Sequence, residues 1–106
     1  MAKNNSKAAT KRFNKFMEQH GDDNWQMDKI KTDIWFECYD LFSIAFNESS
    51  LRMKHLSVDM PAEYATHLMS AKVDEYYNGD LSEDRLLNLF KDCYSCGSTY
   101  IDDVIL

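Results

Sequence analysis

The sequence predicts an all-α protein, a compact bundle of four to five short-to-medium helices. Apolar residues recur every three or four positions from Met27 to Ala45, which is the spacing of one helix face. Glycine and proline together number only four, so long irregular segments are not expected. No convincing pair of segments alternates between apolar and polar residues, as strands with one buried face do.

The first helix is predicted to begin near Thr10, after a polar lead, and to bury Phe13 and Phe16 on one face. Gly21 suits its C-terminal end, because glycine adopts the left-handed conformation at little cost. A helix this short is marginal alone, so we expect its phenylalanine pair to dock against the rest of the protein.

The segment from Met27 to Ala45 is the strongest helix signal, and Asp22 or Asp23 can cap its start. The polar residues 47–50 are predicted to interrupt it. The stretch from Leu51 to Val58 fits either a short helix or an extended connection, and we favour the helix.

Two later helices carry clear start signals. Pro61 suits a first helical turn, where its missing N–H costs nothing, and the helix it opens is predicted to stop at Asn78-Gly79. Asp80 to Glu83 has the pattern of a capping box, with Asp80 as the cap. Gly97 is predicted to end this last helix and to leave residues 98–106 as a tail.

Charge is distributed unevenly along the chain. The net charge is −6, but the first fifteen residues carry +5 and the remainder −11. We therefore predict a flexible basic N-terminal arm at residues 1–9, followed by a single helical domain at 10–106. The acidic body should repel nucleic acid, so direct nucleic-acid binding is expected only through the basic arm, and the alternative is that the arm is a solubilising tail. The basic residues among the first fifteen positions are Lys3, Lys7, Lys11, Arg12 and Lys15.

Composition also bears on location. The N-terminus has no apolar stretch of a secretory signal, no apolar run is long enough to span a bilayer, and the cysteines are odd in number. We expect a cytoplasmic protein with no membrane partner.

The chemical motifs are weak. Cys93 and Cys96 form a CxxC, but the pair closes a predicted helix instead of opening one, as a redox site would require. Zinc needs four ligands, and only Cys38, His20, His55 and His67 remain to complete a site. We predict no metal, no cofactor and no enzymatic activity; a zinc-binding or thiol-dependent protein is the alternative.

The aromatic residues of the central helix offer a candidate binding surface. Burial by neighbouring helices is the expected role of these rings, and an exposed patch for a protein partner is the alternative. Trp35, Tyr39, Phe42 and Phe46 share one broad face, whereas Phe36 points elsewhere.

Acidic pairs and the C-terminal tail offer two further surfaces. The acidic candidates are Asp74, Glu75, Glu83 and Asp84, and the tail candidates are Val104, Ile105 and Leu106. The tail resembles the apolar C-terminal clamp-binding tails of T4-type phage replication and late-transcription accessory proteins, without a diagnostic motif. The resemblance implies docking into a partner's hydrophobic pocket.

These features predict a small acidic protein-interaction module whose partner is a nucleic-acid-binding complex. An acidic face can occupy a basic nucleic-acid channel, as DNA mimics and anti-CRISPR-like phage inhibitors do. The alternative is an accessory factor of a transcription or replication machine that docks through its tail. Homodimerisation through the central helix is also open.

Overall fold

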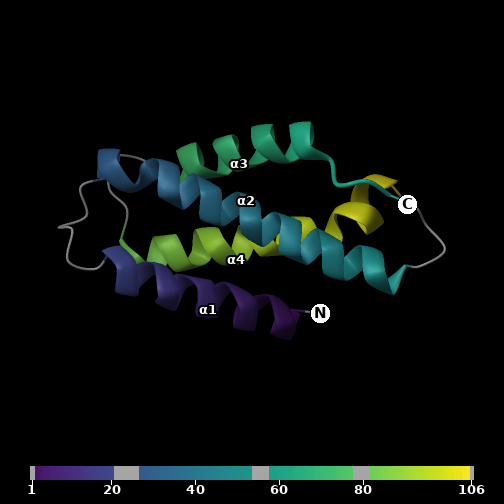
Figure 1. The fold of residues 1–106 in the computed structure, drawn as a ribbon, viewed down its shortest axis with the longest axis horizontal. Coiled ribbons are helices and arrows are strands. Elements are labelled where there is room, and N and C mark those ends of the chain that lie inside the picture. The colour runs from purple at the N-terminus through teal and green to yellow at the C-terminus, as the bar shows by residue number, and fades with distance from the viewer. Residues whose placement is uncertain (1, 21–26, 54–57, 78–81, 106) are drawn as a thin grey trace.

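The computed structural model describes residues 2–20, 27–53, 58–77 and 82–105, and those residues form helices joined by short connections. The elements are α1 (Ala2–His20), α2 (Met27–Arg52), α3 (Ala62–Tyr76) and α4 (Glu83–Tyr100), followed by the π-helical turn η1 (Ile101–Ile105). No strand occurs within these ranges. The predicted all-α bundle is confirmed (Figure 1).

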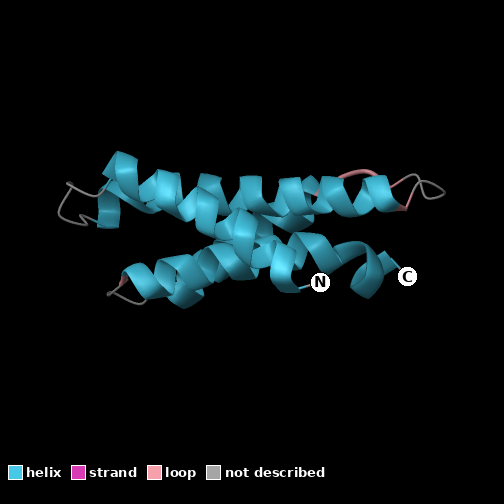
Figure 2. Cartoon of the chain, turned by 90° about the horizontal axis from the view of Figure 1, so that it is seen from below, coloured by secondary structure: helices cyan, strands magenta, loops and turns pink. Residues whose placement is uncertain are grey.

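The helices form a flattened bundle that measures 47 × 25 × 17 Å. Helices α1 and α3 run in the opposite direction to α2 and α4 (Figure 1). The most extensive contact joins α2 to α4, which run parallel to each other. Helix α1 packs mainly on α4, α3 packs on both central helices, and α1 does not touch α3 in the described part of the chain. In the view of Figure 2, the two marked ends of the chain lie on the same side of the molecule.

A glycine allows the two central helices to approach closely. A Cβ atom added at Gly97 would lie 2.9 Å from the Cα and carbonyl carbon of Phe42, and closer still to its carbonyl oxygen. Real Cβ atoms do not approach backbone that closely, so only glycine fits here. Gly97 therefore lies inside α4, and the prediction that it ends the last helix is wrong. We call the contact of Cys38 and Phe42 with Cys93 and Gly97 the inner seam.

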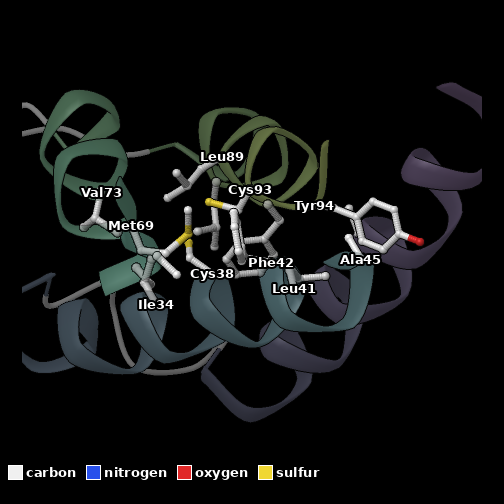
Figure 3. Packing of buried hydrophobic residues seen from close by; sticks show 14 of the residues in the cluster. Ile34, Cys38, Leu41, Phe42, Ala45, Met69, Val73, Leu89, Cys93 and Tyr94 are labelled. Atoms are coloured by element: carbon white, nitrogen blue, oxygen red, sulfur yellow. The ribbon is translucent and has the colours of Figure 1, made fainter. Parts of the chain in front are cut away.

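A single cluster of buried apolar side chains surrounds the inner seam (Figure 3). Phe16 of α1 meets Phe90 of α4 edge to face at a centroid distance of 5.8 Å. Met69 and Val73 of α3 close the other side of the core. The predicted docking of the first helix through its phenylalanines is confirmed, because Phe13 also packs against Phe90.

Two helix boundaries differ from the sequence prediction. Helix α1 begins at Ala2, not near Thr10. Ala9 is fully buried in the core, so packing extends the helix through the polar lead. Helix α2 continues to Arg52 and is not interrupted at residues 47–50. These polar residues fit the helix because Ser49 faces the core while Asn47 and Glu48 point to solvent.

Other boundaries are closer to the expectation. Helix α3 starts at Ala62, so Pro61 is its N-cap and lies one position before the first turn in which it was predicted. The N-cap of α4 is Ser82, whose hydroxyl accepts a hydrogen bond from the Arg85 backbone N–H at 3.2 Å. The predicted cap Asp80 lies outside the described residues, as do Gly21 and Gly79. The segment 51–58 forms no separate helix where it is described, since residues 51–52 complete α2.

Candidate interaction site

The four aromatic residues predicted as one surface are divided between the core and the boundary with solvent. Phe42 and Phe46 are completely buried, and both rings contact Tyr100. Trp35 and Tyr39 are partly buried and stack on each other with centroids 5.3 Å apart. Phe42 and Phe46 therefore belong to the core, as the burial interpretation expected, and only the other pair reaches the surface.

The most exposed aromatic ring of α2 is one that the sequence analysis set aside. Phe36 is 56% exposed, and its ring meets Trp35 edge to face at 5.2 Å. Its position out of step with the apolar stripe was the available signal. An aromatic residue off the core face of a helix must find another neighbour or remain in contact with water.

A hollow of about 400 Å³ lies between α2 and α3 beside this ring. Its side chains combine aromatic, basic, hydroxyl and acidic groups: Lys31, Thr32, Trp35, Phe36, Ser70, Val73 and Asp74. The Trp35 indole N–H donates to Ser70 Oγ at 3.1 Å, which fixes the indole plane. Lys31 Nζ lies 3.3 Å from Asp74 Oδ1 and 5.2 Å from the centre of the Tyr77 ring. The hollow therefore already accommodates one cation between a carboxylate and an aromatic ring.

A second hollow of about 220 Å³ lies between α1 and α2, on the other side of Phe36. Beside it, Arg12 donates to both carboxylate oxygens of Glu37, at 3.0 and 3.1 Å, and to Asp40 at 3.1 Å. The His20 ring nitrogen lies 3.5 Å from Asp33. These pairs join α1 to α2 around the hollow.

The four predicted acidic residues gather at one end of the bundle. Asp74 and Glu75 lie in the last turn of α3, and Glu83 and Asp84 lie in the first turn of α4; all four are exposed. Two hydrogen bonds from Arg85 to the carbonyl oxygen of Tyr76, at 2.7 and 3.2 Å, hold these two turns together. We call this group the acidic corner.

The helix dipole accounts for only half of the acidic corner. Glu83 and Asp84 lie at a helix N-terminus, where negative charge is stabilised. Asp74 and Glu75 lie at a helix C-terminus, where the dipole disfavours negative charge, and no basic residue shares that turn. Helix stability therefore gives no reason for an acidic last turn in α3.

A partly buried network holds α3 against α4 next to the acidic corner. Lys72 Nζ and the Tyr76 hydroxyl both donate to Asp92 Oδ2, at 3.0 and 3.1 Å. The hydrogen bond to Asp92 raises the pKa of Lys72. Burial, and then the bond to Asp92, raise the pKa of Tyr76. Both shifts favour the protonated forms that make these bonds.

The structure describes only part of the predicted C-terminal surface, and only some basic residues of α1 form one exposed face. In η1, Ile101 is buried and Val104 is 53% exposed, while the side chain of Ile105 and all of Leu106 lie outside the described residues. In α1, Lys7, Lys11 and Lys15 are exposed at helical spacing. Arg12 is turned toward Glu37 and is not part of that basic face.

The cysteines are placed for packing. Figure 3 shows the sulfur atoms of Cys38 and Cys93 close together in the core between α2 and α4. The hydrogen bond with Cys38, and then burial, raise the pKa of Cys93, and burial raises the pKa of Cys96 to about 11. These shifts are opposite in sign to those of an activated thiol nucleophile. No group of three His, Cys, Asp or Glu residues within the described ranges could hold a metal ion, and His55 lies outside those ranges.

The fold and the site define a class of protein, an all-α four-helix bundle with an acidic surface beside an aromatic-lined hollow. No protein-family model, curated protein or solved structure matches the chain. Among the helices as described, none is both long and apolar enough to cross a membrane.

Proposed function

We propose that this protein is a non-enzymatic interaction module that binds a basic surface of a nucleic-acid-handling complex. The observation that carries the proposal is the acidic corner with the α2–α3 hollow beside it, because Asp74 belongs to both. A basic surface that binds phosphates attracts carboxylates of this kind in the same way. The protein would then act as an inhibitor by occupying that surface.

The electrostatic position of Asp74 and Glu75 supports this proposal. Their carboxylates oppose the dipole of α3, so they are retained at a small cost in helix stability. Both are exposed and accessible to another molecule. A contribution to binding is the reason we infer for that cost.

The hollow supports the proposal by its recognition chemistry. A carboxylate next to an aromatic face suits a lysine or arginine side chain. Lys31 makes such contacts with Asp74 and Tyr77 within the chain. An arginine from the partner would enter over Trp35, displace the Lys31 ammonium from Asp74, and bind the carboxylate through two hydrogen bonds.

The test compares two charge reversals that change the net charge equally. Asp74→Lys with Glu75→Lys alters the acidic corner, whereas Asp102→Lys with Asp103→Lys alters exposed acids of η1. We expect proteins captured by the wild-type chain from its native cell to be lost with the first variant and retained with the second. Capture by the wild type should also weaken steeply as salt rises. Equal capture by both variants would contradict the proposal.

An exposed apolar residue in η1 favours a second candidate function. Val104 offers a side chain for a hydrophobic pocket of a replication or transcription protein, while Ile101 anchors the turn to the core. Truncation after Asp103 should then abolish capture while the charge reversal at Asp74 and Glu75 leaves it intact. The two candidates thus predict opposite results from the same pair of variants.

A further inference from the structure

The solvent side of α2 carries a row of exposed side chains, one of which, Asp40, also accepts a hydrogen bond from Arg12 of α1. Three of them are large and apolar: Phe36 is 56% exposed, Ile44 38% and Leu51 71%. The polar residues Asp40 and Asn47 lie between them, and both are exposed. The steps of four, four, three and four residues place all five on one helix face. We call this face the outer ridge.

The outer ridge is symmetric about its own midpoint, which lies between Ser43 and Ile44. Phe36 and Leu51 are equally far from that midpoint, and so are Asp40 and Asn47. A second copy of α2 laid antiparallel on the first would therefore place Phe36 against Leu51 and Asp40 against Asn47. Ile44 would meet Ile44 of the second copy beside the axis. Such self-complementarity is what a twofold-symmetric interface requires.

We propose that this protein forms a homodimer in which the outer ridges of two copies pack antiparallel about a twofold axis between Ser43 and Ile44. This inference goes beyond the proposed function, since the acidic corner lies on α3 and α4, although Phe36 of the outer ridge also lines the α2–α3 hollow. It also assigns a role to Phe36 and Leu51, which the chain itself leaves in water.

Charge favours this arrangement over the alternatives. In the antiparallel register, three acidic residues of one copy lie opposite uncharged residues of the second copy. Asp40 lies opposite Asn47, Glu37 opposite Ser50, and Glu48 opposite Tyr39. No carboxylate in this part of α2 meets a carboxylate of the second copy. A parallel pairing would place Asp40 against Asp40, and like charges in contact oppose association. For a chain of net charge −6, a face on which the acids avoid each other is the one suited to self-association.

The first test uses Asn47, because its register partner is Asp40. Asn47→Lys should tighten the dimer by pairing with Asp40, and Asn47→Asp should weaken it through repulsion, each by roughly threefold to tenfold. Asn88→Lys and Asn88→Asp on the exposed side of α4 change the net charge identically and should leave the dimer unchanged. Sedimentation equilibrium of the full chain measures all four. Equal effects at Asn47 and Asn88 would overturn the register.

The second test uses the axis itself. Ile44→Lys brings two ammonium groups together and should raise the dimer dissociation constant by about a hundredfold. Thermal unfolding of the Ile44→Lys variant checks that it still folds. Ile44→Cys tests the same axis independently, through cross-linking between copies. In a Cys96→Ser background, mild oxidation should cross-link Cys at position 44 between copies faster than Cys introduced at the exposed His67 of α3. A wild-type chain that sediments as a monomer at every concentration, or equal cross-linking rates, would overturn the proposal.

Discussion

Phe42 and Phe36 lie on the same helix but in opposite environments. Phe42 is completely buried in the inner seam, where the backbone of α4 comes close enough to require glycine. Phe36 projects from the outer ridge between two hollows. Residue type and helix propensity are identical at the two positions, so the difference arises from the neighbouring helices alone. The aromatic side chains of α2 therefore stabilise the core on one face and are exposed to solvent on the other.

Truncation of the two phenylalanines should give the largest contrast in stability. Phe42→Ala removes a buried ring from a packed core and should lower the free energy of unfolding by about 4 kcal/mol. Phe36→Ala removes a mostly solvated ring and should change it by less than about 0.5 kcal/mol. Urea denaturation followed by circular dichroism measures both at a concentration where the chain is monomeric. A cost above about 2 kcal/mol for Phe36→Ala would mean that this ring contributes to the core.

The inner seam can be tested by the sign of a second substitution, Gly97→Ala. Helix propensity alone predicts that alanine stabilises a helix interior by about 1 kcal/mol relative to glycine. The close approach of the Phe42 backbone predicts the opposite, because the added methyl group must push α2 and α4 apart. We expect a destabilisation of about 3 kcal/mol.

Ser98→Ala is the matched control for this experiment. It makes a similarly small change at the next position of α4, and it should alter the free energy of unfolding by less than about 0.5 kcal/mol. A Gly97→Ala variant as stable as the wild type or more stable would contradict the tight seam.

Gly97 also shows why part of the fold could not be predicted from sequence. Local rules treat a glycine near the end of an apolar stretch as a helix stop. The requirement here comes from Phe42, which is distant in sequence, so no local pattern contains it. The existence of the helices was predictable because their apolar periodicity is itself local. Their contacts were not.

The surface was predictable to a different extent. The acidic pairs could be named from sequence, because charged side chains are solvated wherever the helices lie. Their gathering at one corner depends on the antiparallel packing of α3 on α4, which Arg85 and Tyr76 hold together. The aromatic residues could not be sorted from the stripe alone, since burial on a second face depends on where the flanking helices pack. Phe36 was therefore missed, and Phe42 and Phe46 were named as partner residues although both are buried.

The side of α4 that packs on α2 and α3 should make folding sensitive to alkali. Burial raises the pKa of Cys96 from 9.0 to about 11. Burial and the hydrogen bond to Glu48 raise the pKa of Tyr94 from 10.0 to about 12. Both groups hold their protons more tightly in the folded state than in the unfolded state. Their contribution is complete below the unfolded values and is lost as the pH rises through the folded values.

The free energy of unfolding should therefore fall as the pH rises from 9 to 12, the window that the values for Cys96 and Tyr94 define. Cys96→Ser should flatten the lower part of this decline and Tyr94→Phe the upper part. Urea titrations at a series of pH values measure the slopes, and Phe36→Ala on the outer ridge should keep the wild-type slope. If Tyr94→Phe declined as steeply as the wild type, the Tyr94 hydroxyl would not be coupled to folding. The contrast between the two faces of α2 would then rest on packing alone.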